Sequence, residues 1–373
     1  MSSTAQLIET AITAQASSAD SSVNLEIVPG SEFNSELGKL SQSFVDTQRT
    51  GHPFQLADWS AESSSLFLIV RQSAKIQAFA RCDITWPLGK RFDRIRALTL
   101  TRGPVCDDPV LMRGVLRQLV ALCKGRGFLY LDINPDWTDA DAEDLAQWLE
   151  SHDWFAAGPA RASLRVDLRP ELGNIFETFR KTTRAEIRRA QNSGVDIAVA
   201  GADSIERFLR MYVDMARAKG FAPDPEHHMR GVLTWLTENP GRGVLLTAVS
   251  KAMILGGVVA VRAGSRCWYV WGATQKDSDV NVGHLLQWHA MQWAREQGCT
   301  EYDLGGYREG ASDGPALFKK GFSEKVFRFL PTYRHALNSG RYSIYSALVP
   351  GLYKAKALLG SFNALRPGAS KVP

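Results

Sequence analysis

Hydrophobic residues in the first half of the chain alternate with polar ones or form short blocks, a spacing that predicts β-strands. The expected strands are residues 65–70 (SLFLIV), 75–84 (KIQAFARCDI), 94–105 (RIRALTLTRGPV) and 128–133 (FLYLDI). From Pro109 to Lys124 the apolar residues recur at helical spacing. Two more helices are expected, at 141–152 and 175–191, with a strand at 162–168 between them. The pattern predicts a mixed α/β fold.

The same order of elements returns in the second half. Strands are expected at residues 243–250, 252–264 and 265–274, a helix at 282–297 and a strand at 299–306. In each half a glycine ends the helix, and an aspartate follows five residues later near the end of the next strand: Gly127 with Asp132, and Gly298 with Asp303. Glycine suits the end of a helix because it adopts positive φ without a Cβ clash.

We interpret this repetition as two copies of one α/β unit, at residues 23–165 and 166–340. A tail at 1–22 precedes them, and a C-terminal helix and tail at 341–373 follow. Helix, glycine and strand also follow one another by coincidence in many α/β proteins, but the match of the whole order favours duplication. A chain of 373 residues also exceeds the usual size of a single core.

Composition narrows the class of protein. Hydrophobic residues at 45% and charged residues at 22% are typical of a globular protein. The polar segment 1–22 lacks the basic and apolar parts of a signal peptide, so we expect a disordered tail on a cytoplasmic protein. A formal net charge of +5 favours anionic partners such as phosphorylated metabolites, RNA or an anionic membrane face, unless the excess serves only solubility.

Several common kinds of site lack their motifs. The five cysteines form no CxxC pair and the seven histidines form no HExxH, so we expect neither a catalytic metal nor any other cofactor. The motifs GxSxG, Walker A and GxGxxG are absent where each would be needed, which removes the main support for a hydrolase, a P-loop nucleotidase or a Rossmann dehydrogenase. A transfer reaction without a metal or a covalent nucleophile remains.

The densest basic segment is FRKTTRAEIRRAQNSG, residues 179–194. On a helix, Arg180, Arg184 and Arg188 are spaced four apart and line one face. Like charges at this spacing repel unless an anion or carboxylates lie opposite, and Glu177 and Glu186 offset only part of the charge. The segment is therefore either a phosphate-binding face, which suits the planar fork of arginine, or a solvated helix face.

Two loops at strand ends are candidate ligand sites, because α/β proteins tend to bind ligands there. LTRGPV places Arg102 and Gly103 directly after a strand, and YDLGGYREG places Asp303 at a strand end before Gly305 and Gly306. A glycine pair allows a sharp turn or a close approach of ligand to backbone amides. Both segments can equally be ordinary tight turns.

PALFKKGF, residues 315–322, sets two adjacent lysines between phenylalanines. A lysine beside aromatic rings usually lays its stem along them and keeps its ammonium in water. Alternatively, the ammonium of Lys319 is held for a negative charge that appears only during a reaction, while Phe318 and Phe322 anchor the segment.

Six segments occur in an order that resembles one family. They are HPFQLADW (52–59), RGPV (102–105), LDINP (131–135), FRKTTRAEIRRAQNSGVDI (179–197), GHLLQWHAMQWAREQGCTEYDLGG (283–306) and LFKKGFSEK (317–325). Together they resemble the FemABX family, aminoacyl-tRNA-dependent transferases that build peptidoglycan cross-bridges on two tandem GNAT-like domains. The sequence shows no long charged coiled-coil insertion, and in this respect it is similar to the arm-less members of the family.

The resemblance implies a substrate groove between or along the two domains. The donor would be an aminoacyl-tRNA carrying glycine, alanine or serine, and the acceptor UDP-MurNAc-pentapeptide or lipid II, with peripheral contact to the cytoplasmic membrane face. The GNAT pyrophosphate loop is represented only by VNVGHLL, where Gly283 is the lone glycine. Few amides could then gather around a CoA pyrophosphate, which favours a donor other than acetyl-CoA.

The resemblance also assigns roles to residues. Lys319 matches the lysine near the acyl-transfer centre, Asp303 is a candidate base, and Arg184 and Arg188 match a basic helix expected to hold phosphate. The other expected substrate-binding residues are Arg102, Gly103, Tyr130, Asn134, Trp271, Gly305 and Gly306. Asn134 stands where many relatives carry aspartate.

Two rival functions remain open. The same fold could serve an acyl-CoA-dependent N-acyltransferase of exopolysaccharide or secondary-metabolite biosynthesis, since GNAT-like folds host many acyl transfers. The basic face could instead belong to a non-catalytic RNA-binding protein.

Overall fold

The computed structural model describes residues 23–59, 65–92, 95–251, 253–275 and 280–349. The expected tail at 1–22 and the last part of the expected C-terminal segment, 350–373, lie outside these ranges. Two mixed sheets of seven strands form the body of the molecule, so the predicted mixed α/β fold is confirmed. Within the described ranges, no helix combines the length and the apolar character needed to cross a bilayer.

The first half of the chain contains six strands and three long helices in the described residues. These are β1 (Val23–Pro29), α2 (Ser35–Thr47), β2 (Ser65–Gln72), β3 (Lys75–Thr85), β4 (Arg96–Leu100), α3 (Pro109–Cys123), β5 (Phe128–Ile133), α4 (Asp139–Glu150) and β6 (Trp154–Ala156). The strand expected at 94–105 is shorter because the chain turns after Leu100, and Arg102 adopts a left-handed conformation with φ of 62°.

The second half holds the remaining elements. These are β7 (Arg161–Asp167), α5 (Leu172–Thr178), α6 (Lys181–Gln191), β8 (Asp196–Val199), α7 (Ala202–Lys219), α8 (Glu226–Glu238), β9 (Gly243–Ser250), β10 (Met253–Ala263), β11 (Arg266–Thr274), α9 (Gly283–Glu296), β12 (Glu301–Tyr307), α10 (Gly314–Lys320), β13 (Val326–Phe329) and β14 (Tyr333–Ala336). The single helix expected at 175–191 is two helices, because Phe179 and Arg180 between them have extended backbone.

The two sheets repeat one topology. Their strand orders are β1-β2-β3-β4-β5-β14-β6 and β8-β9-β10-β11-β12-β7-β13, and the single parallel pair in each, β4 with β5 and β11 with β12, is joined by a helix. Gly127 and Gly298, which precede β5 and β12, have φ of 80° and 81°. Gly298 directly follows the C-cap of α9, as predicted. The prediction for Gly127 is wrong in detail, because α3 ends at Cys123 and the glycine that follows its C-cap Lys124 is Gly125, with φ of 78°. The order of elements still repeats in both halves.

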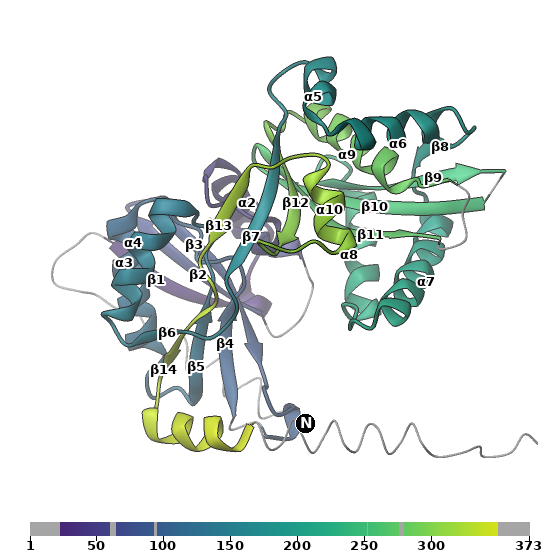
Figure 1. Cartoon of the computed structure of the whole chain (residues 1–373). Helices are drawn as coiled ribbons and strands as arrows, with labels where there is room; N and C mark the ends of the chain where they lie inside the picture. Colours follow the sequence, from purple (N-terminus) through teal and green to yellow (C-terminus); the bar gives the residue numbers. More distant parts are fainter. Residues whose placement is uncertain (1–22, 60–64, 93–94, 252, 276–279, 350–373) are drawn as a thin grey trace, which may run out of the picture.

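Two strands cross between the halves. β7 follows β6 but pairs with β12 and β13 in the second sheet, and β14 follows β13 but pairs with β5 and β6 in the first (Figure 1). The expected division at residue 165 falls inside β7, and the expected second unit, 166–340, contains a strand of the first sheet. Arg334 fixes β14 in place, with Nε and Nη2 each 2.7 Å from an Asp132 oxygen and its guanidinium 3.6 Å from the Tyr130 ring centroid.

Alternate residues of each sheet enter two different cores. In β2, Leu66 and Leu68 face α3 and α4, whereas Phe67 and Ile69 face a core shared with α2, α7, α8 and the second sheet. α5, α6 and α9 cover the other face of the second sheet. The molecule is thus layered, and its central layer belongs to both halves, which fixes their relative position.

A buried ion cluster joins the two halves beside this shared core. The fully buried carboxylate of Asp136, from the loop after β5, accepts hydrogen bonds from Arg102 Nη1 at 2.9 Å and Arg266 Nη1 at 2.6 Å. Arg165 Nη2 lies 3.9 Å from the same carboxylate. Burial alone would raise the pKa of Asp136, but Arg102 and Arg266 outweigh it and hold this pKa well below its usual range.

Removing this charge should destabilise the fold strongly. Asp136→Asn leaves three arginines around an uncharged group, and breaking a buried ion pair from one side costs about 3–5 kcal/mol of unfolding free energy. Because the folded-state pKa of Asp136 is depressed, its contribution is present above the unfolded pKa of about 3.9 and is lost as the pH falls below that value. Urea unfolding at several pH values measures both effects.

The control is Asp141→Asn, which removes a carboxylate paired with Arg49 at 2.7 Å where both side chains are half-exposed. This pair should contribute at most about 1 kcal/mol. Equal losses of unfolding free energy in the two variants at pH 7 would contradict the role of Asp136. So would a difference between the Asp136 variant and the wild type that does not become smaller in acid.

Candidate functional site

β11 and β12 separate beyond their first three paired residues. Arg266, Cys267 and Trp268 pair with residues 301–303, and further along β11 pairs only with β10 while β12 pairs with β7. Two parallel strands that diverge in this way leave a wedge-shaped gap between them. The backbone N–H and C=O groups that face this gap make no hydrogen bonds within the sheet. The wedge opens at the strand ends, where open α/β sheets usually bind ligands.

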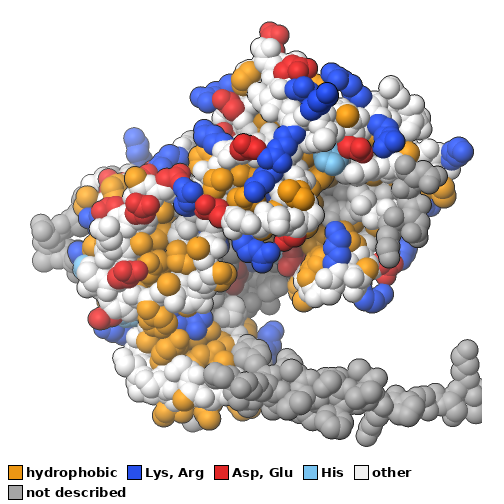
Figure 2. Space-filling model, in the orientation of Figure 1, with side chains coloured by type: hydrophobic (Ala, Val, Ile, Leu, Met, Phe, Trp, Pro, Cys, Tyr) orange, Lys and Arg blue, Asp and Glu red, His pale blue; other side chains and the backbone are white. Residues whose placement is uncertain are grey.

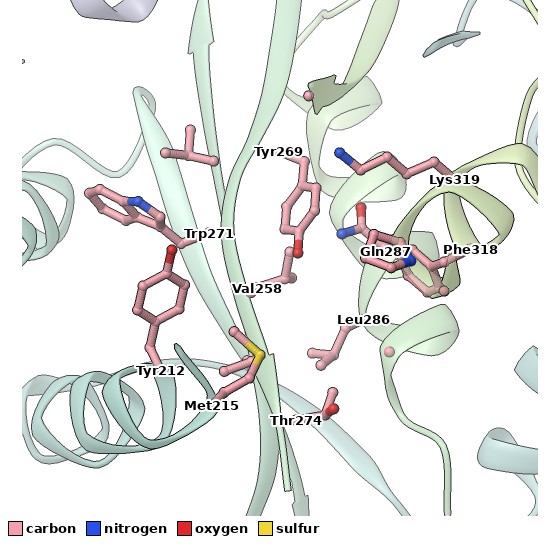
Figure 3. Close-up of a pocket in the computed structure, with 18 of the residues that line it drawn as sticks. Tyr212, Met215, Val258, Tyr269, Trp271, Thr274, Leu286, Gln287, Phe318 and Lys319 are labelled. Atoms are coloured by element: carbon pink, nitrogen blue, oxygen red, sulfur yellow. The ribbon is translucent and has the colours of Figure 1, made fainter. Parts of the chain in front are cut away.

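A cavity of about 580 Å³ occupies this wedge and is bordered by α7, α9 and α10 (Figure 3). Its wall includes many aromatic side chains and three residues that the sequence predicted for substrate binding. The aromatic residues are Tyr212, Phe221, Tyr269, Trp271 and Phe318, and the predicted residues are Trp271, Gly305 and Gly306. Such a volume is typical of a small-molecule or cofactor site.

Lys319, the predicted catalytic lysine, lines the cavity from the last turn of α10. The helix starts at Asp313, whose Oδ1 accepts a hydrogen bond from the Ala316 amide at 3.0 Å. Lys319 Nζ donates to the carbonyl of Gly306 at 2.6 Å and lies 5.8 Å from the Tyr269 ring centroid. One N–H direction is therefore used, and two remain for a ligand.

The ammonium of Lys319 loses solvent in this position. Burial lowers its pKa from 10.5 to about 8, although Asp303 and Asp313 act in the opposite direction. A lysine with a pKa near the operating pH can act either as an ammonium donor or as a neutral amine. The lowered pKa and the position in the cavity make Lys319 a candidate for the reactive group.

Asp303 lies behind the turn that presents Gly306 to Lys319. Its Oδ2 accepts hydrogen bonds from Ser163 and Arg165, and its Oδ1 accepts one from the Gly305 amide at 2.8 Å. The carboxylate is 2% exposed and does not line the cavity. Its contacts are those of a group that positions the turn, with both oxygens occupied, rather than those of a base facing the substrate.

Gly305 could not be replaced by another residue in this turn. Its φ of 72° is left-handed, and a Cβ would lie 3.0 Å from the carbonyl oxygen of Tyr269. The turn therefore needs glycine at this position for a local reason.

Gln287, which the sequence analysis did not single out, also faces the cavity. It is only 2% exposed, and its Oε1 accepts a hydrogen bond from the hydroxyl of Tyr302 at 2.8 Å. Because Tyr302 is fully buried and its hydroxyl needs an acceptor, it fixes the Gln287 amide in one orientation, with the NH₂ group left unused by this bond. Gln287 lines the same cavity as Lys319 (Figure 3). A glutamine within the apolar stripe of α9 is the signal that could have identified it.

Trp271 lines the cavity from β11. Its indole Nε1 donates to Asp224 Oδ2 at 2.8 Å, which ties the strand to the loop between α7 and α8. Its ring lies 6.2 Å from the ring of Trp59 in the first half. The predicted Trp271 is therefore held rigidly between the cavity and the shared core.

The predicted basic face on α6 lies apart from the cavity. Arg184 Nη1 lies 3.0 Å from Glu177 and also donates to two backbone carbonyls, and Arg188 packs on Phe176 with Glu177 3.9 Å away. Over this part of the surface, basic side chains are interspersed with acidic ones (Figure 2). Neither arginine lines the cavity.

Three of the remaining predicted residues lie at the junction between the halves, whereas Tyr130 lies within the first sheet and packs on Tyr342 and Tyr345. Arg102 bonds to Asp136, and its amide donates to Asn134 Oδ1, while Asn134 Nδ2 donates to Thr332. Gly103 faces the side chain of Gln55, with no room for a Cβ. Tyr130 is buried beneath Arg334. None of these four predicted residues lines the cavity at Lys319.

Comparison with known proteins agrees with this architecture. Residues 177–320, which include every residue of the cavity wall, match the model of the acetyltransferase (GNAT) domain. The chain is 22% identical over 279 residues to a UDP-N-acetylmuramoylpentapeptide-lysine N(6)-alanyltransferase of Weissella viridescens, covering 70% of this chain and 80% of that protein. It is 30% identical over 112 residues to a lipid II:glycine glycyltransferase of Staphylococcus aureus, but spans only 27% of that protein.

The similarity in structure extends over both halves. The crystal structure of FemX superposes with a TM-score of 0.72 at 16% identity, covering 82% of this chain and 98% of FemX. A likeness at this identity establishes the fold, and the sequence relatives agree with it. In its sequence relatives and its fold the chain resembles the FemABX family of transferases, and it is built from two tandem GNAT-like domains.

Proposed function

We propose that the protein moves an amino acid from an aminoacyl-tRNA to the stem-peptide amine of a peptidoglycan precursor. The observation that carries this proposal is the ammonium of Lys319, held in a cavity between two separated strands and beside the carbonyl of Gly306. The Weissella relative is a transferase named for alanyl transfer to a muramoylpentapeptide lysine. The acceptor would be UDP-MurNAc-pentapeptide or lipid II.

In the proposed reaction the acceptor amine attacks the carbonyl carbon of the aminoacyl ester. A C–N bond forms, the carbonyl oxygen becomes negative, and the C–O bond to the ribose then breaks. The amine loses a proton and the ribose hydroxyl gains one. An ester is already activated, so positioning and stabilisation of the oxyanion would supply most of the acceleration. The Lys319 ammonium would donate to that oxyanion or to the leaving ribose oxygen.

Gln287 would provide a second donor. Its side chain lines the same cavity, and the Tyr302 hydroxyl holds the amide in a single orientation. Asp303 would act as a positioning residue, because it binds the Gly305 amide and thereby sets the turn that carries the Lys319 partner. The base that accepts the amine proton is left unassigned, and the amine can release it to solvent.

Two further roles stay predictions. Arg184 and Arg188 would hold the diphosphate of the acceptor, for which their contacts to Glu177 would have to open. The helical segment 339–349 exposes Ile344 and Leu348, and Figure 2 displays hydrophobic side chains over this part of the first domain. This surface would rest on a membrane face if the acceptor is lipid-linked.

The decisive experiment incubates the protein with charged tRNA and either UDP-linked or lipid-linked muropeptide, then measures product masses. A mass increase of one glycine, alanine or serine residue identifies donor and reaction together. Acylation that requires acyl-CoA and no RNA would instead support an N-acyltransferase, which the GNAT-domain match also allows. RNA binding without any product would support a non-catalytic role.

Lys319→Met should fold normally and lose about 10²- to 10³-fold in kcat/KM for transfer, the usual effect of removing one oxyanion donor. The matched control is Lys320→Met, since the Lys320 ammonium lies over the ring of Tyr307, 5.6 Å from its centroid, and does not line the cavity. Steady-state kinetics compare the two variants. Wild-type turnover in the Lys319 variant would remove this lysine from the mechanism.

The pH profile separates the two possible roles of Lys319. Its pKa is lowered to about 8, so the ammonium predominates below pH 8 and the neutral amine above it. If the ammonium stabilises the oxyanion, kcat falls as the pH rises through about 8, and Lys319→Arg keeps its residual activity there because arginine stays charged. A rate that instead rises through pH 8 in the wild type, but not in Lys319→Arg, would assign a general base.

The donor role of Gln287 predicts a graded series. Gln287→Leu should lower kcat about 10²-fold, and Gln287→Glu should lower it further, because a carboxylate repels the oxyanion. Tyr302→Phe should lower kcat about tenfold with KM unchanged, because the amide is no longer held. Equal activity of the Leu and Glu variants would show that this position only shapes the cavity.

A further inference from the structure

A second cavity, of about 950 Å³, adjoins the one at Lys319. It lies where β10 begins and β11 ends, against α7. The two cavities share four wall residues, which are Met215, Lys219, Thr274 and Asn281. The two cavities therefore adjoin along α7, and we call the two together the channel.

The described charged residues in the wall of the second cavity are mainly positive. Arg207, Arg210 and Lys219 line it from α7, and Asp214 is the one acidic side chain among its described wall residues. Asp214 is already paired with Arg217 at 3.0 Å. Three cations and one neutralised carboxylate give the cavity a field that attracts anions.

These three cations have no ion-pair partner in the described part of the chain. The acid whose charge acts on Arg210 is Glu206, which already binds Arg230 through both oxygens at 2.8 and 3.0 Å. On α6 the pattern is opposite: Arg184 and Arg188 share Glu177, and Arg189 faces Glu186. Cations without partners, next to a cavity, suit an external anion better than cations that are already neutralised.

The position of the cations relative to Lys319 limits the shape of the ligand. Lys319 lies beside Tyr269, and Thr274, which also lines the second cavity, lies five positions further along β11 than Tyr269. At the rise of a strand this is about 16 Å. On α7, Arg207 and Lys219 are twelve residues apart, or about 18 Å. The channel thus fits an extended polyanion with its reactive end at Lys319.

Aromatic side chains also line the channel, on the side of the first cavity. Tyr212 from α7 and Phe221 just after it face the first cavity, with ring centroids 6.2 Å apart. In Figure 3, Tyr212 and Met215 lie on the side of the cavity away from Lys319. Rings beside a basic groove are the recurring means of holding single-stranded nucleic acid, because bases stack on the rings while the phosphates meet the cations.

We propose that the second cavity binds the phosphates of the single-stranded 3′ end of the donor RNA, through Arg207, Arg210 and Lys219. The terminal ribose ester would then lie in the first cavity at Lys319, with a base near Tyr212 and Phe221. This inference rests on the proposed function for the identity of the RNA. What the inference adds to the proposed function is the location of the RNA phosphates, on α7 rather than on the basic face of α6.

The test measures binding of an uncharged RNA hairpin that ends in single-stranded CCA, by fluorescence anisotropy over a range of salt concentrations. Arg207→Ala/Arg210→Ala should weaken binding at least about tenfold at low salt. It should also reduce the slope of log K against log salt by about 1.4, because each single-strand phosphate contact contributes roughly 0.7. A blunt hairpin without CCA should bind equally weakly to wild type and variant.

The matched control is Arg169→Ala/Arg189→Ala. It removes the same charge from two exposed, ion-paired arginines that line neither cavity, so it should leave the affinity for RNA and the slope nearly unchanged. Equal losses in both double variants would mean a diffuse electrostatic effect, and a larger loss in Arg188→Ala would place the phosphates on α6. Either result overturns the proposal.

Two further outcomes separate this inference from the proposed function. If no amino acid is transferred but CCA-dependent binding is lost in Arg207→Ala/Arg210→Ala, the location of the RNA stands while the reaction does not. Transfer with an unchanged KM for aminoacyl-tRNA in this variant overturns the location alone. Binding of coenzyme A that the variant abolishes, without any binding of RNA, would assign the channel to a small nucleotide and also overturn it.

Discussion

The buried carboxylate of Asp136 and the arginines around it fix the geometry on which the site depends. Arg165 and Arg266, which face Asp136, also contact Glu301, at the start of β12. β11 and β12 pair only beside this cluster and separate directly beyond it. The same charges that hold the two domains together therefore hold the vertex of the wedge, so the width of the cavity depends on the contact between domains.

The channel combines two kinds of electrostatic environment. At Lys319 a single cation has lost solvent, which lowers its pKa and makes its interaction with a developing charge strong. Along α7 the cations are exposed, and their effect is weaker, longer in range and sensitive to salt. The first environment suits a charge that exists only during reaction, and the second suits a ligand that is charged throughout.

Local signals made much of the fold predictable. The glycines that precede β5 and β12, and the alternation within the long strands, were enough to identify two α/β units. The exchange of β7 and β14 between the sheets could not be predicted. The alternation of apolar and polar residues within a strand does not specify which distant strand it pairs with. In the site, Lys319 was predicted from its aromatic surroundings, whereas Gln287 was hidden within an apolar helix. Glu177 neutralises the α6 arginines only because the chain breaks between α5 and α6.

The exchange of strands has a consequence for synthesis. Residues 333–336 fill the gap between β5 and β6, yet they are translated after the whole of the second domain. While the ribosome is still making that domain, the first sheet has an open slot whose two edges expose unpaired backbone groups. Folding of the first domain on the ribosome must therefore stop one strand short, and a premature stop codon near the end of the message would damage the domain encoded first.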